Sequence, residues 1–279
     1  MKRIIALTLA AIMLVLCLAS CGAENNTEDT DAEKKENTTL TVAASSTPHA
    51  EILEECKASL EEKGITLDIK VMDDYVIPNN STESGDVDAN YFQHTPYLDQ
   101  FNEENGTHLV SVAKVHYEPY GIYAGTVDSL DKIPDGAKIA VPNDATNEAR
   151  ALQLLAANGL IALKADAGLT ATKNDITENK KNLEIVEMEA ALISGMRDEV
   201  AVAVINGNYA IEAGLKVSEA LAVEDKDSEA AQTFANILVV KEGNEKNEAV
   251  LALVEALQSD EVQNFIAVKY DGAVVPMAK

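Results

Sequence analysis

An order of strand, helix and strand at the start of the folded region constrains this chain most strongly. Residues 40–44 and 66–72 are predicted strands. Between them, Thr47 and Pro48 are typical of an N-cap and a first helical position, and the helix is expected to run to about Lys63. Strands joined by a helix of this length lie parallel, so the unit predicts an α/β fold.

The carboxyl ends of these two strands carry candidate ligand-binding residues. Ser45 and Ser46 follow the first strand, and Tyr75 follows the second. In open parallel sheets, ligands bind beyond the carboxyl ends of the strands. A ligand pocket is therefore expected near these three residues.

The remaining body predicts two lobes, because about 240 residues exceed what one compact core usually holds. Further strands are expected at residues 109–115, 138–141, 200–205 and 234–240, and further helices at 96–105, 147–157 and 247–270. The chain is expected to cross between lobes near Gly121 and Glu224, which makes lobe 1 residues 40–121 plus 225–279 and lobe 2 residues 122–224. We expect each lobe to be a mainly parallel sheet flanked by helices, with a ligand cleft between the lobes.

Residues 1–20 are predicted to be a signal peptide. Lys2-Arg3 precedes an apolar run, residues 4–18, which is too short for a comfortable membrane span and typical of a signal sequence. The segment Leu18-Ala19-Ser20-Cys21 resembles a bacterial lipobox, whose cysteine is lipid-modified and becomes the mature N-terminus. Acyl chains such as palmitate on Cys21 would give stable membrane anchoring. An ordinary secretory signal with an incidental cysteine is the alternative.

A polar segment follows the lipidation site. Residues 21–39 consist mainly of Asn, Thr, Glu, Asp and Lys, which predicts a disordered, lipidated tether that spans roughly 20–25 Å as a coil. The folded body is thus expected on the extracytoplasmic face of the cell membrane. The formal net charge of −25 argues against a nucleic-acid partner, since such proteins carry a basic patch.

The cysteines exclude an internal disulfide in the mature chain. Cys17 leaves with the signal and Cys21 carries lipid, so Cys56 remains alone. Its helical spacing from Ile52 and Leu60 predicts a small core residue.

Aromatic residues are concentrated in one stretch of the chain. Eight of the Phe and Tyr residues lie between Tyr75 and Tyr123, and the chain has no Trp. Small-molecule pockets combine apolar and aromatic walls with a few placed polar groups. The cluster, centred on residues 91–97, therefore predicts either a ligand pocket or the aromatic part of a core.

Arg150 is the main candidate for an anion-binding residue. Thr146 is the predicted N-cap of the helix after strand 138–141, which places Arg150 in the first turn, where the helix dipole disfavours a cation. An anionic partner is therefore expected. A ligand carboxylate would match the guanidinium fork, and a salt bridge to Asp144 or Glu148 is the alternative.

Two asparagines follow the buried strand 200–205. The amides of Asn206 and Asn208 can offer donors and acceptors to a zwitterion. The Asn206-Gly207 pair is equally typical of a turn.

From Val42 to Pro276 the chain resembles the methionine-binding lipoproteins of ABC importers, the NlpA or MetQ-like family. The resemblance covers nearly the whole mature body and rests on blocks in the family's order. These are Pro48–Leu53, Asp88–His94, Pro96–Leu98, Pro142–Asp144, Thr146–Glu148, Ile205–Ala210 and Gly272–Pro276.

The resemblance implies a type II-like periplasmic-binding-protein fold that closes on L-methionine between its lobes. It implies a binding protein rather than an enzyme, with no cofactor and no metal, which delivers its solute to an ABC permease and its ATPase. The implied ligand-binding residues are Tyr75, Phe92, His94 and Tyr97 around the thioether, Arg150 on the carboxylate, and Asn147, Asn206 and Asn208 on the head group.

The chain departs from the family pattern at three places. Ala149 stands where Gly is usual, Tyr120 follows Glu118-Pro119 where an apolar residue such as Met is common, and the Ser45-Ser46 segment differs from the usual Thr-Pro-Val pattern. If these residues touch the ligand, specificity could shift to D-methionine, a Met-containing dipeptide or another neutral amino acid.

Two other classes of function remain open from the residues. A metal-binding lipoprotein is suggested by His49, His94, His108 and His116, although their spacing contains no local ligand pair. An enzyme could use Ser45 or Ser46 with His94, although no nucleophile-elbow motif accompanies them. A surface interaction protein without a solute would leave Arg150 and the aromatic cluster unexplained.

Overall fold

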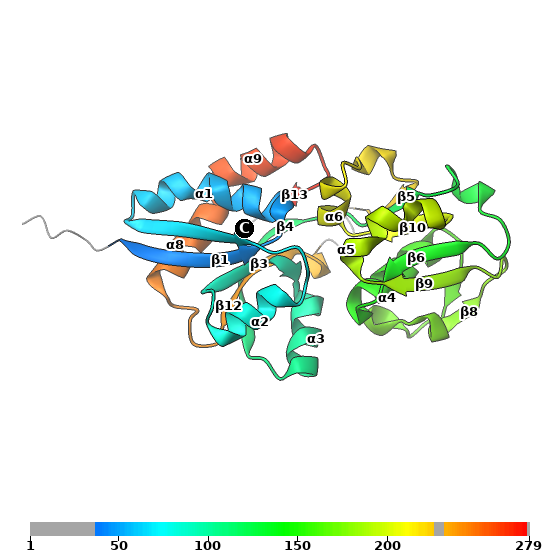
Figure 1. The fold of residues 1–279 in the computed structure, drawn as a ribbon, viewed down its shortest axis with the longest axis horizontal. Coiled ribbons are helices and arrows are strands. Elements are labelled where there is room, and N and C mark those ends of the chain that lie inside the picture. The colour runs from blue at the N-terminus through cyan, green and yellow to red at the C-terminus, as the bar shows by residue number, and fades with distance from the viewer. Residues whose placement is uncertain (1–36, 226–231, 278–279) are drawn as a thin grey trace, which may run out of the picture. The chain divides into compact units, whose positions relative to one another are not determined.

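The computed structural model describes residues 37–225 and 232–277, and these residues form one compact unit (Figure 1). The predicted signal peptide, Cys21 and residues 22–36 of the predicted tether lie outside the described residues. No helix in the described ranges has the length and apolar character needed to cross a membrane.

The first of two large sheets has six strands. Residues 37–71 confirm the predicted strand–helix–strand unit, since its two strands pair in parallel. In spatial order the strands are β13 (Val275–Pro276), β4 (Leu109–Tyr117), β12 (Asn236–Lys241), β3 (Ala89–His94), β1 (Thr38–Ala44) and β2 (Ile65–Val71).

The six-stranded sheet is mixed, whereas a mainly parallel sheet was expected. Strands β1, β2 and β3 run parallel, but β12 pairs antiparallel with both β3 and β4, and β13 pairs antiparallel with β4. No helical crossover links β12 to β3 or β4, because the chain reaches β12 from the other large sheet, so nothing requires parallel pairing there.

Helices cover both faces of this sheet (Figure 1). On one face lie α1 (Glu51–Glu61), α8 (Glu248–Leu257) and α9 (Asp260–Tyr270), and on the other α2 (Ile77–Ser84) and α3 (Thr95–Asn105). Accordingly, β12 is apolar on both sides: Leu238 joins the core under α1, while Ile237 joins a cluster with Leu98 of α3.

The second large sheet has five strands and is also mixed, with two parallel and two antiparallel pairings. Its strands in spatial order are β11 (Ala222–Val223), β5 (Gly121–Ala124), β10 (Val202–Ile205), β6 (Lys138–Pro142) and β9 (Glu184–Met188). Its helices are α4 (Ala145–Ala157), α5 (Ala190–Ile193) and α6 (Gly207–Glu212).

Strands β7 (Ala162–Leu163) and β8 (Ile176–Glu178) form a separate two-stranded sheet. The described short 3-10 turns are η2 (Leu130–Lys132), η3 (Gly168–Thr170), η4 (Lys173–Asp175), η5 (Ser194–Glu199) and η6 (Val217–Glu219).

The two sheets make the fold a two-lobed α/β fold, as predicted. The chain passes from β4 to β5 through residues 118–120, and it returns to the first sheet between β11 and β12. The lobe boundaries at residues 121 and 224 stay a prediction.

Three local predictions differ from the structure. Strand β1 begins at Thr38, inside the segment predicted as tether. The first helix begins with a π-helical turn, η1 (Ser46–Ala50), before α1, although Thr47 has the extended angles expected of the residue that precedes the helix. The predicted helix 247–270 is two helices, since Ser259 is extended and its hydroxyl caps α9 by accepting from the Val262 N–H.

Cys56 is a core residue, as predicted. It is fully buried in α1, and its thiol donates to the Ile52 carbonyl oxygen at 3.5 Å.

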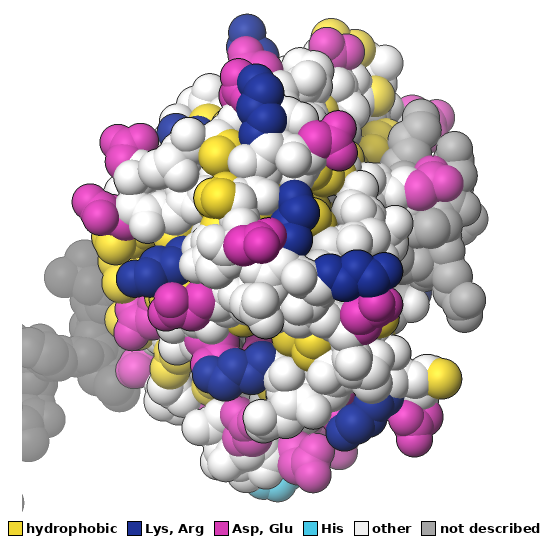
Figure 2. All heavy atoms as spheres, turned by 90° about the vertical axis from the view of Figure 1, so that its right-hand side faces the viewer, with side chains coloured by type: hydrophobic (Ala, Val, Ile, Leu, Met, Phe, Trp, Pro, Cys, Tyr) yellow, Lys and Arg dark blue, Asp and Glu magenta, His cyan; other side chains and the backbone are white. Residues whose placement is uncertain are grey.

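Charges of both signs share the surface of the five-stranded lobe. On the face in Figure 2, Lys and Arg side chains lie next to Asp and Glu side chains. Ion pairs in this lobe include Lys164–Asp175 at 2.8 Å and Lys173–Glu187 at 2.6 Å. Much of the positive charge in this lobe is therefore neutralised locally.

Candidate functional site

One cavity is bordered by residues from both lobes. All eight residues predicted to bind ligand line it: Tyr75, Phe92, His94, Tyr97, Asn147, Arg150, Asn206 and Asn208. Four lining residues were not predicted: Gln93, Glu118, Gly207 and Asn236. The convergence follows from topology, since most of these residues sit at strand ends or on the helices that follow them.

The cavity is small. Its volume is about 20 Å³, which is room for about one water molecule. A larger groove of about 510 Å³ lies beside it, and Tyr75 and Tyr97 line both spaces. These two rings therefore form a wall between the cavity and the groove, and an amino acid could enter only if the walls move.

The first lobe supplies an aromatic wall. Tyr75 lies between β2 and α2, Phe92 on β3, and Tyr97 on α3. Their ring centroids are 5.7 to 6.1 Å apart, and the Tyr97 hydroxyl donates to the Tyr75 carbonyl oxygen at 2.9 Å. These contacts hold the rings in fixed orientations.

The predicted aromatic cluster serves two roles. Tyr91, Tyr117 and Tyr120 are fully buried and do not line the cavity, whereas Tyr75, Phe92 and Tyr97 do. The core interpretation is therefore confirmed for part of the cluster, and the ligand-pocket interpretation stays a prediction for the rings that line the cavity.

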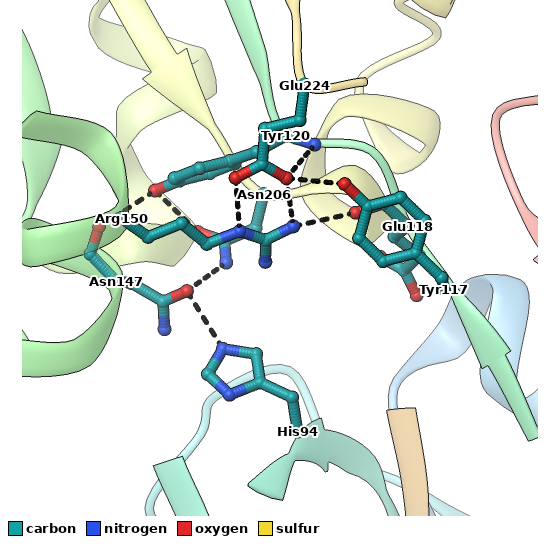
Figure 3. Close-up of polar contacts among 8 residues, drawn as sticks. All are labelled: His94, Tyr117, Glu118, Tyr120, Asn147, Arg150, Asn206 and Glu224. Carbon is teal, nitrogen blue, oxygen red and sulfur yellow. Dashed lines mark hydrogen bonds and ion pairs between the residues drawn. The ribbon is translucent and has the colours of Figure 1, made fainter. Parts of the chain in front are cut away.

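His94 joins the aromatic wall to the polar one. It caps α3, because its Nδ1 accepts from the Tyr97 N–H at 3.2 Å. The proton is thus on Nε2, which donates to Asn147 Oδ1 at 3.2 Å (Figure 3). Burial, with Arg150 nearby, lowers the pKa of His94 to about 3, so the ring is neutral at physiological pH.

The N-cap of α4 is Asp144, not Thr146 as predicted. The Asp144 carboxylate accepts from the Asn147 N–H at 2.9 Å, and Thr146 lies inside the helix. Since Ala145 is the first helical residue, Arg150 lies in the second turn. The prediction that it opposes the dipole in the first turn is wrong, because that effect fades within one turn.

Arg150 nevertheless has an anionic partner, and this partner is Glu224. Nε donates to Glu224 Oε1 at 2.8 Å and Nη2 to Oε2 at 2.6 Å, a bidentate pair (Figure 3). Burial works against the charges, but Arg150 holds the pKa of Glu224 below its ordinary value. The predicted alternatives, Asp144 and Glu148, are instead the α4 cap and an acceptor for the Lys173 N–H.

One donor of Arg150 remains available on the cavity side. Nη2 also donates to the Glu118 carbonyl oxygen at 2.9 Å. Among the described residues, Nη1 donates no hydrogen bond, and in Figure 3 it points away from Glu224 toward the side of His94. The guanidinium also lies 4.6 Å from the Tyr120 ring centroid and 4.3 Å from that of Phe234.

The three asparagines are not equivalent. Asn147 Oδ1 accepts from Asn206 Nδ2 at 2.9 Å, and Asn147 Nδ2 donates to the Asp144 carboxylate, so protein groups already occupy the Asn147 amide. Asn208 Oδ1 accepts from the Tyr75 hydroxyl at 2.6 Å. Its Nδ2 is buried and has no hydrogen-bond partner among the described residues. That orphaned donor points to a ligand.

Glu118 is a buried carboxylate that sequence reasoning missed. It lies between β4 and β5, and its Oε1 accepts from His116 Nε2 at 2.8 Å, with His49 Nε2 at 3.5 Å. His116 Nδ1 is in turn bonded to the Tyr91 hydroxyl. The Asn208 backbone N–H also bonds to the carboxylate, but burial raises the pKa of Glu118.

The alternative functions can be compared with these contacts. Ser46 Oγ donates to Glu212 at 3.1 Å, and both ring nitrogens of His94 bond to other groups, so the suggested serine–histidine pair is not formed. His49 and His116 meet at Glu118, with ligand atoms within 4.8 Å of one another, whereas His108 is exposed near Glu83.

The departures from the family pattern lie outside the cavity lining. Ala149 is buried in α4, Tyr120 stacks behind Arg150, and Ser45 and Ser46 are absent from the lining. A shift in specificity through direct contact at these positions is therefore not supported.

Glu118 and Glu224 carried weak sequence signals. Both lie where the chain was predicted to cross between lobes, and a buried arginine implies a carboxylate somewhere. The partner of Arg150 is 74 residues away in sequence, which no local pattern reveals.

Most of the chain is similar to known lipoproteins. A family model described as NlpA lipoprotein matches residues 40–278. A methionine-binding lipoprotein MetQ of Bacillus subtilis is 41% identical over 98% of this chain and 99% of its own length. Among solved structures, a lipoprotein from Ruminococcus gnavus is 60% identical with a TM-score of 0.85, covering 86% of this chain and 99% of its own. A nutrient-binding protein from Burkholderia cenocepacia, solved bound to methionine, is 39% identical with a TM-score of 0.80, covering 85% and 99%.

Proposed function

Because this chain belongs to the NlpA lipoprotein family, we propose that it captures L-methionine in the cavity between its lobes and delivers it to an ABC permease and its ATPase. Lipid on Cys21 would hold the body at the extracytoplasmic face of the cell membrane. The protein binds and releases its solute without a chemical step. The names of the relatives that bind methionine support this solute.

The observation that carries the proposal is the convergence of all eight predicted residues on one buried cavity. Tyr75, Phe92 and Tyr97 would pack against the thioether, since sulfur packs well against aromatic rings. Arg150 Nη1 and Asn208 Nδ2 would donate to the carboxylate, because both are free of hydrogen bonds to described residues.

Capture requires the lobes to separate. Side-chain hydrogen bonds that join them include Tyr75 to Asn208 at 2.6 Å, Tyr209 to the Asp73 carbonyl at 2.9 Å, Ser46 to Glu212 at 3.1 Å and His94 to Asn147 at 3.2 Å. Each is worth about 1 kcal/mol net, so opening these four costs a few kcal/mol, which ligand contacts can offset. On this proposal, the closed form with ligand is the form that docks on the permease.

Calorimetric titration of the full-length protein in detergent tests the proposal. The protein is first unfolded and refolded, so that co-purified ligand does not mask binding. We expect L-methionine to bind tightly to the wild type and at least about a hundredfold more weakly to Arg150→Ala. Binding of a Met-containing dipeptide, D-methionine or another amino acid in its place would move the specificity, and binding of no amino acid would refute the function.

A further inference from the structure

The charges around the cavity do not balance. Arg150 and Glu224 form a bidentate pair, so their charges cancel. Glu118 also lines the cavity, and no Lys or Arg side chain in the described ranges forms an ion pair with it. Its two ion-pair neighbours are His49 and His116, and burial lowers the pKa of these rings to about 4 and about 3. Both rings are neutral at physiological pH, so no protein cation in the described ranges lies at ion-pair distance from the Glu118 carboxylate.

The carboxylate of Glu118 lies among cavity residues. A Cβ added to Gly207 would be 2.7 Å from Glu118 Oε2, and the Asn208 N–H bonds to the same carboxylate. Both residues line the cavity, as does Asn236, which bonds to His49. Glycine at position 207 is thus required for the close approach of this carboxylate.

Hydrogen-bond donors that could bind the carboxylate of a ligand lie in the same cavity as Glu118. Arg150 Nη1 points into the space beside His94, and its neighbour Nη2 already bonds to the Glu118 backbone (Figure 3). Asn208 lies next to both ends of the cavity chemistry: its backbone N–H bonds to the Glu118 carboxylate, and its side-chain Nδ2 has no hydrogen-bond partner among the described residues. An α-amino acid carries its two charges on adjacent groups, which fits a carboxylate and an arginine on one small cavity.

We propose that Glu118 binds the α-ammonium group of the ligand, so that the site selects a zwitterion rather than a carboxylic acid. The inference rests on the proposed function and deepens it by assigning the group that recognises the amino end. Arg150 alone would accept any carboxylate of suitable shape. Glu118 adds the requirement for a positive charge next to it.

His116 acts as a positioning residue for this carboxylate. Its Nδ1 accepts from the Tyr91 hydroxyl, which leaves the proton on Nε2 to donate to Glu118 Oε1. That bond holds one oxygen away from the ligand, and the other faces Gly207 and Asn208. The same three side chains could instead coordinate a divalent ion, and the experiment below separates the two cations.

The test compares removal of the Glu118 charge, removal of the ligand amino group, and removal of both, as in a double-mutant cycle. The refolded full-length protein is titrated in detergent with L-methionine and with its desamino analogue, which keeps the thioether and the carboxylate. We expect the wild type to prefer L-methionine by about a hundredfold, because charge-assisted hydrogen bonds are lost with the amino group. In Glu118→Gln this preference should fall below about tenfold, with most of the loss on L-methionine. Glu148→Gln changes another buried carboxylate, outside the cavity, and should keep the wild-type preference.

Each other outcome overturns the inference in a distinct way. If Glu118→Gln lowers the affinities for L-methionine and for the desamino analogue equally, Glu118 has a structural role only, and the proposed function stays intact. A wild type that binds both ligands equally well would exclude ammonium recognition without any variant. Zinc chloride that binds the wild type, fails with His116→Gln and lowers methionine affinity would assign the cluster to a metal. Binding of no amino acid by the wild type would instead refute the function itself.

A second variant covers a failure of Glu118→Gln to fold, judged by circular dichroism. Glu118→Asp keeps the charge but shortens the side chain by one methylene. It should lower the affinity for L-methionine at least about tenfold more than that for the desamino analogue. Equal effects on both ligands would contradict the inference.

Discussion

Two buried carboxylates beside the cavity, Glu118 and Glu224, have opposite surroundings. Glu224 accepts two hydrogen bonds from a guanidinium, and Arg150 holds its pKa below the ordinary value. Glu118 accepts from a neutral imidazole and a backbone N–H, and burial raises its pKa. The first carboxylate is therefore a counter-ion for the protein's own arginine, and the second is left for a cation from outside. The ligand carboxylate shares Arg150 with Glu224 on this account.

The largest expected effect comes from removing the arginine. Arg150→Ala leaves Glu224 as a buried charge without its partner, so the free energy of unfolding should fall by about 3–5 kcal/mol. Urea unfolding at neutral pH measures this change. Arg197→Ala is the matched control, because Arg197 is half-buried and, within the part of the chain that the structure describes, makes only long bonds, of 3.3 and 3.4 Å, to the Ser194 and Ala124 carbonyls. A loss above about 1 kcal/mol there, or a similarly small loss in Arg150→Ala, would contradict the comparison.

The two carboxylates should respond differently to loss of charge. Glu224→Gln leaves Arg150 buried beside a neutral amide, and we expect a loss of about 2–3 kcal/mol at neutral pH. Glu118→Gln should leave the free energy of unfolding within about 1 kcal/mol of the wild type or raise it, because no buried cation loses a partner. Thermal or urea unfolding of both variants decides this. Equal losses would mean that both carboxylates serve the same purpose.

The pH dependence should separate the two residues by sign. The pKa of Glu118 is raised in the folded state, so ionisation of Glu118 lowers the free energy of unfolding as the pH rises above the ordinary pKa of 4.5. The stability of Glu118→Gln relative to the wild type should therefore increase with rising pH. The pKa of Glu224 is lowered in the folded state, so its ionised form contributes stability above pH 4.5, and this contribution is lost as the pH falls. The free energy of unfolding of Glu224→Gln should therefore approach that of the wild type in acid. Each slope is at most about 1.4 kcal/mol per pH unit. Parallel curves for the two variants between about pH 4 and 7 would refute the assignment.

The smallest effect is expected at the orphaned amide. Asn208→Ala removes the acceptor of the Tyr75 hydroxyl and one proposed donor to the ligand, so L-methionine affinity should fall about tenfold. Calorimetric titration measures the change. Asn158→Ala removes an amide that bonds to the Leu154 carbonyl at the end of α4, outside the cavity, and should leave the affinity unchanged. Wild-type affinity in Asn208→Ala would show that its Nδ2 does not reach the ligand.

The sequence was most informative where local patterns carry the structure. Alternating strands and helices predicted most elements, and the resemblance to a known family named Tyr75 and Arg150, which line the same cavity. Local patterns failed where two signals competed, since both Asp144 and Thr146 can cap a helix and only the fold selects one. The break at Ser259 had a local signal, a serine cap followed by Asp260 and Glu261, but the apolar periodicity on both sides of it favoured one long helix.

The ion pairs of the site could not be predicted from local patterns. Arg150 was recognised as needing an anion, but its partner Glu224 is brought close only by the return of the chain after β11. Glu118 meets His49 through packing of η1 against the first sheet, across 69 positions of sequence. Such pairings depend on tertiary structure, which a single sequence does not reveal.

A crystal structure of the refolded protein with L-selenomethionine as the ligand tests the central claim most directly. The account predicts one strong anomalous selenium peak between the rings of Tyr75, Phe92 and Tyr97. It also predicts the ligand carboxylate within hydrogen-bond distance of Arg150 Nη1, with the amino group near Glu118. A selenium peak in the outer groove beside Tyr209, or a ligand whose carboxylate does not reach Arg150, would contradict it.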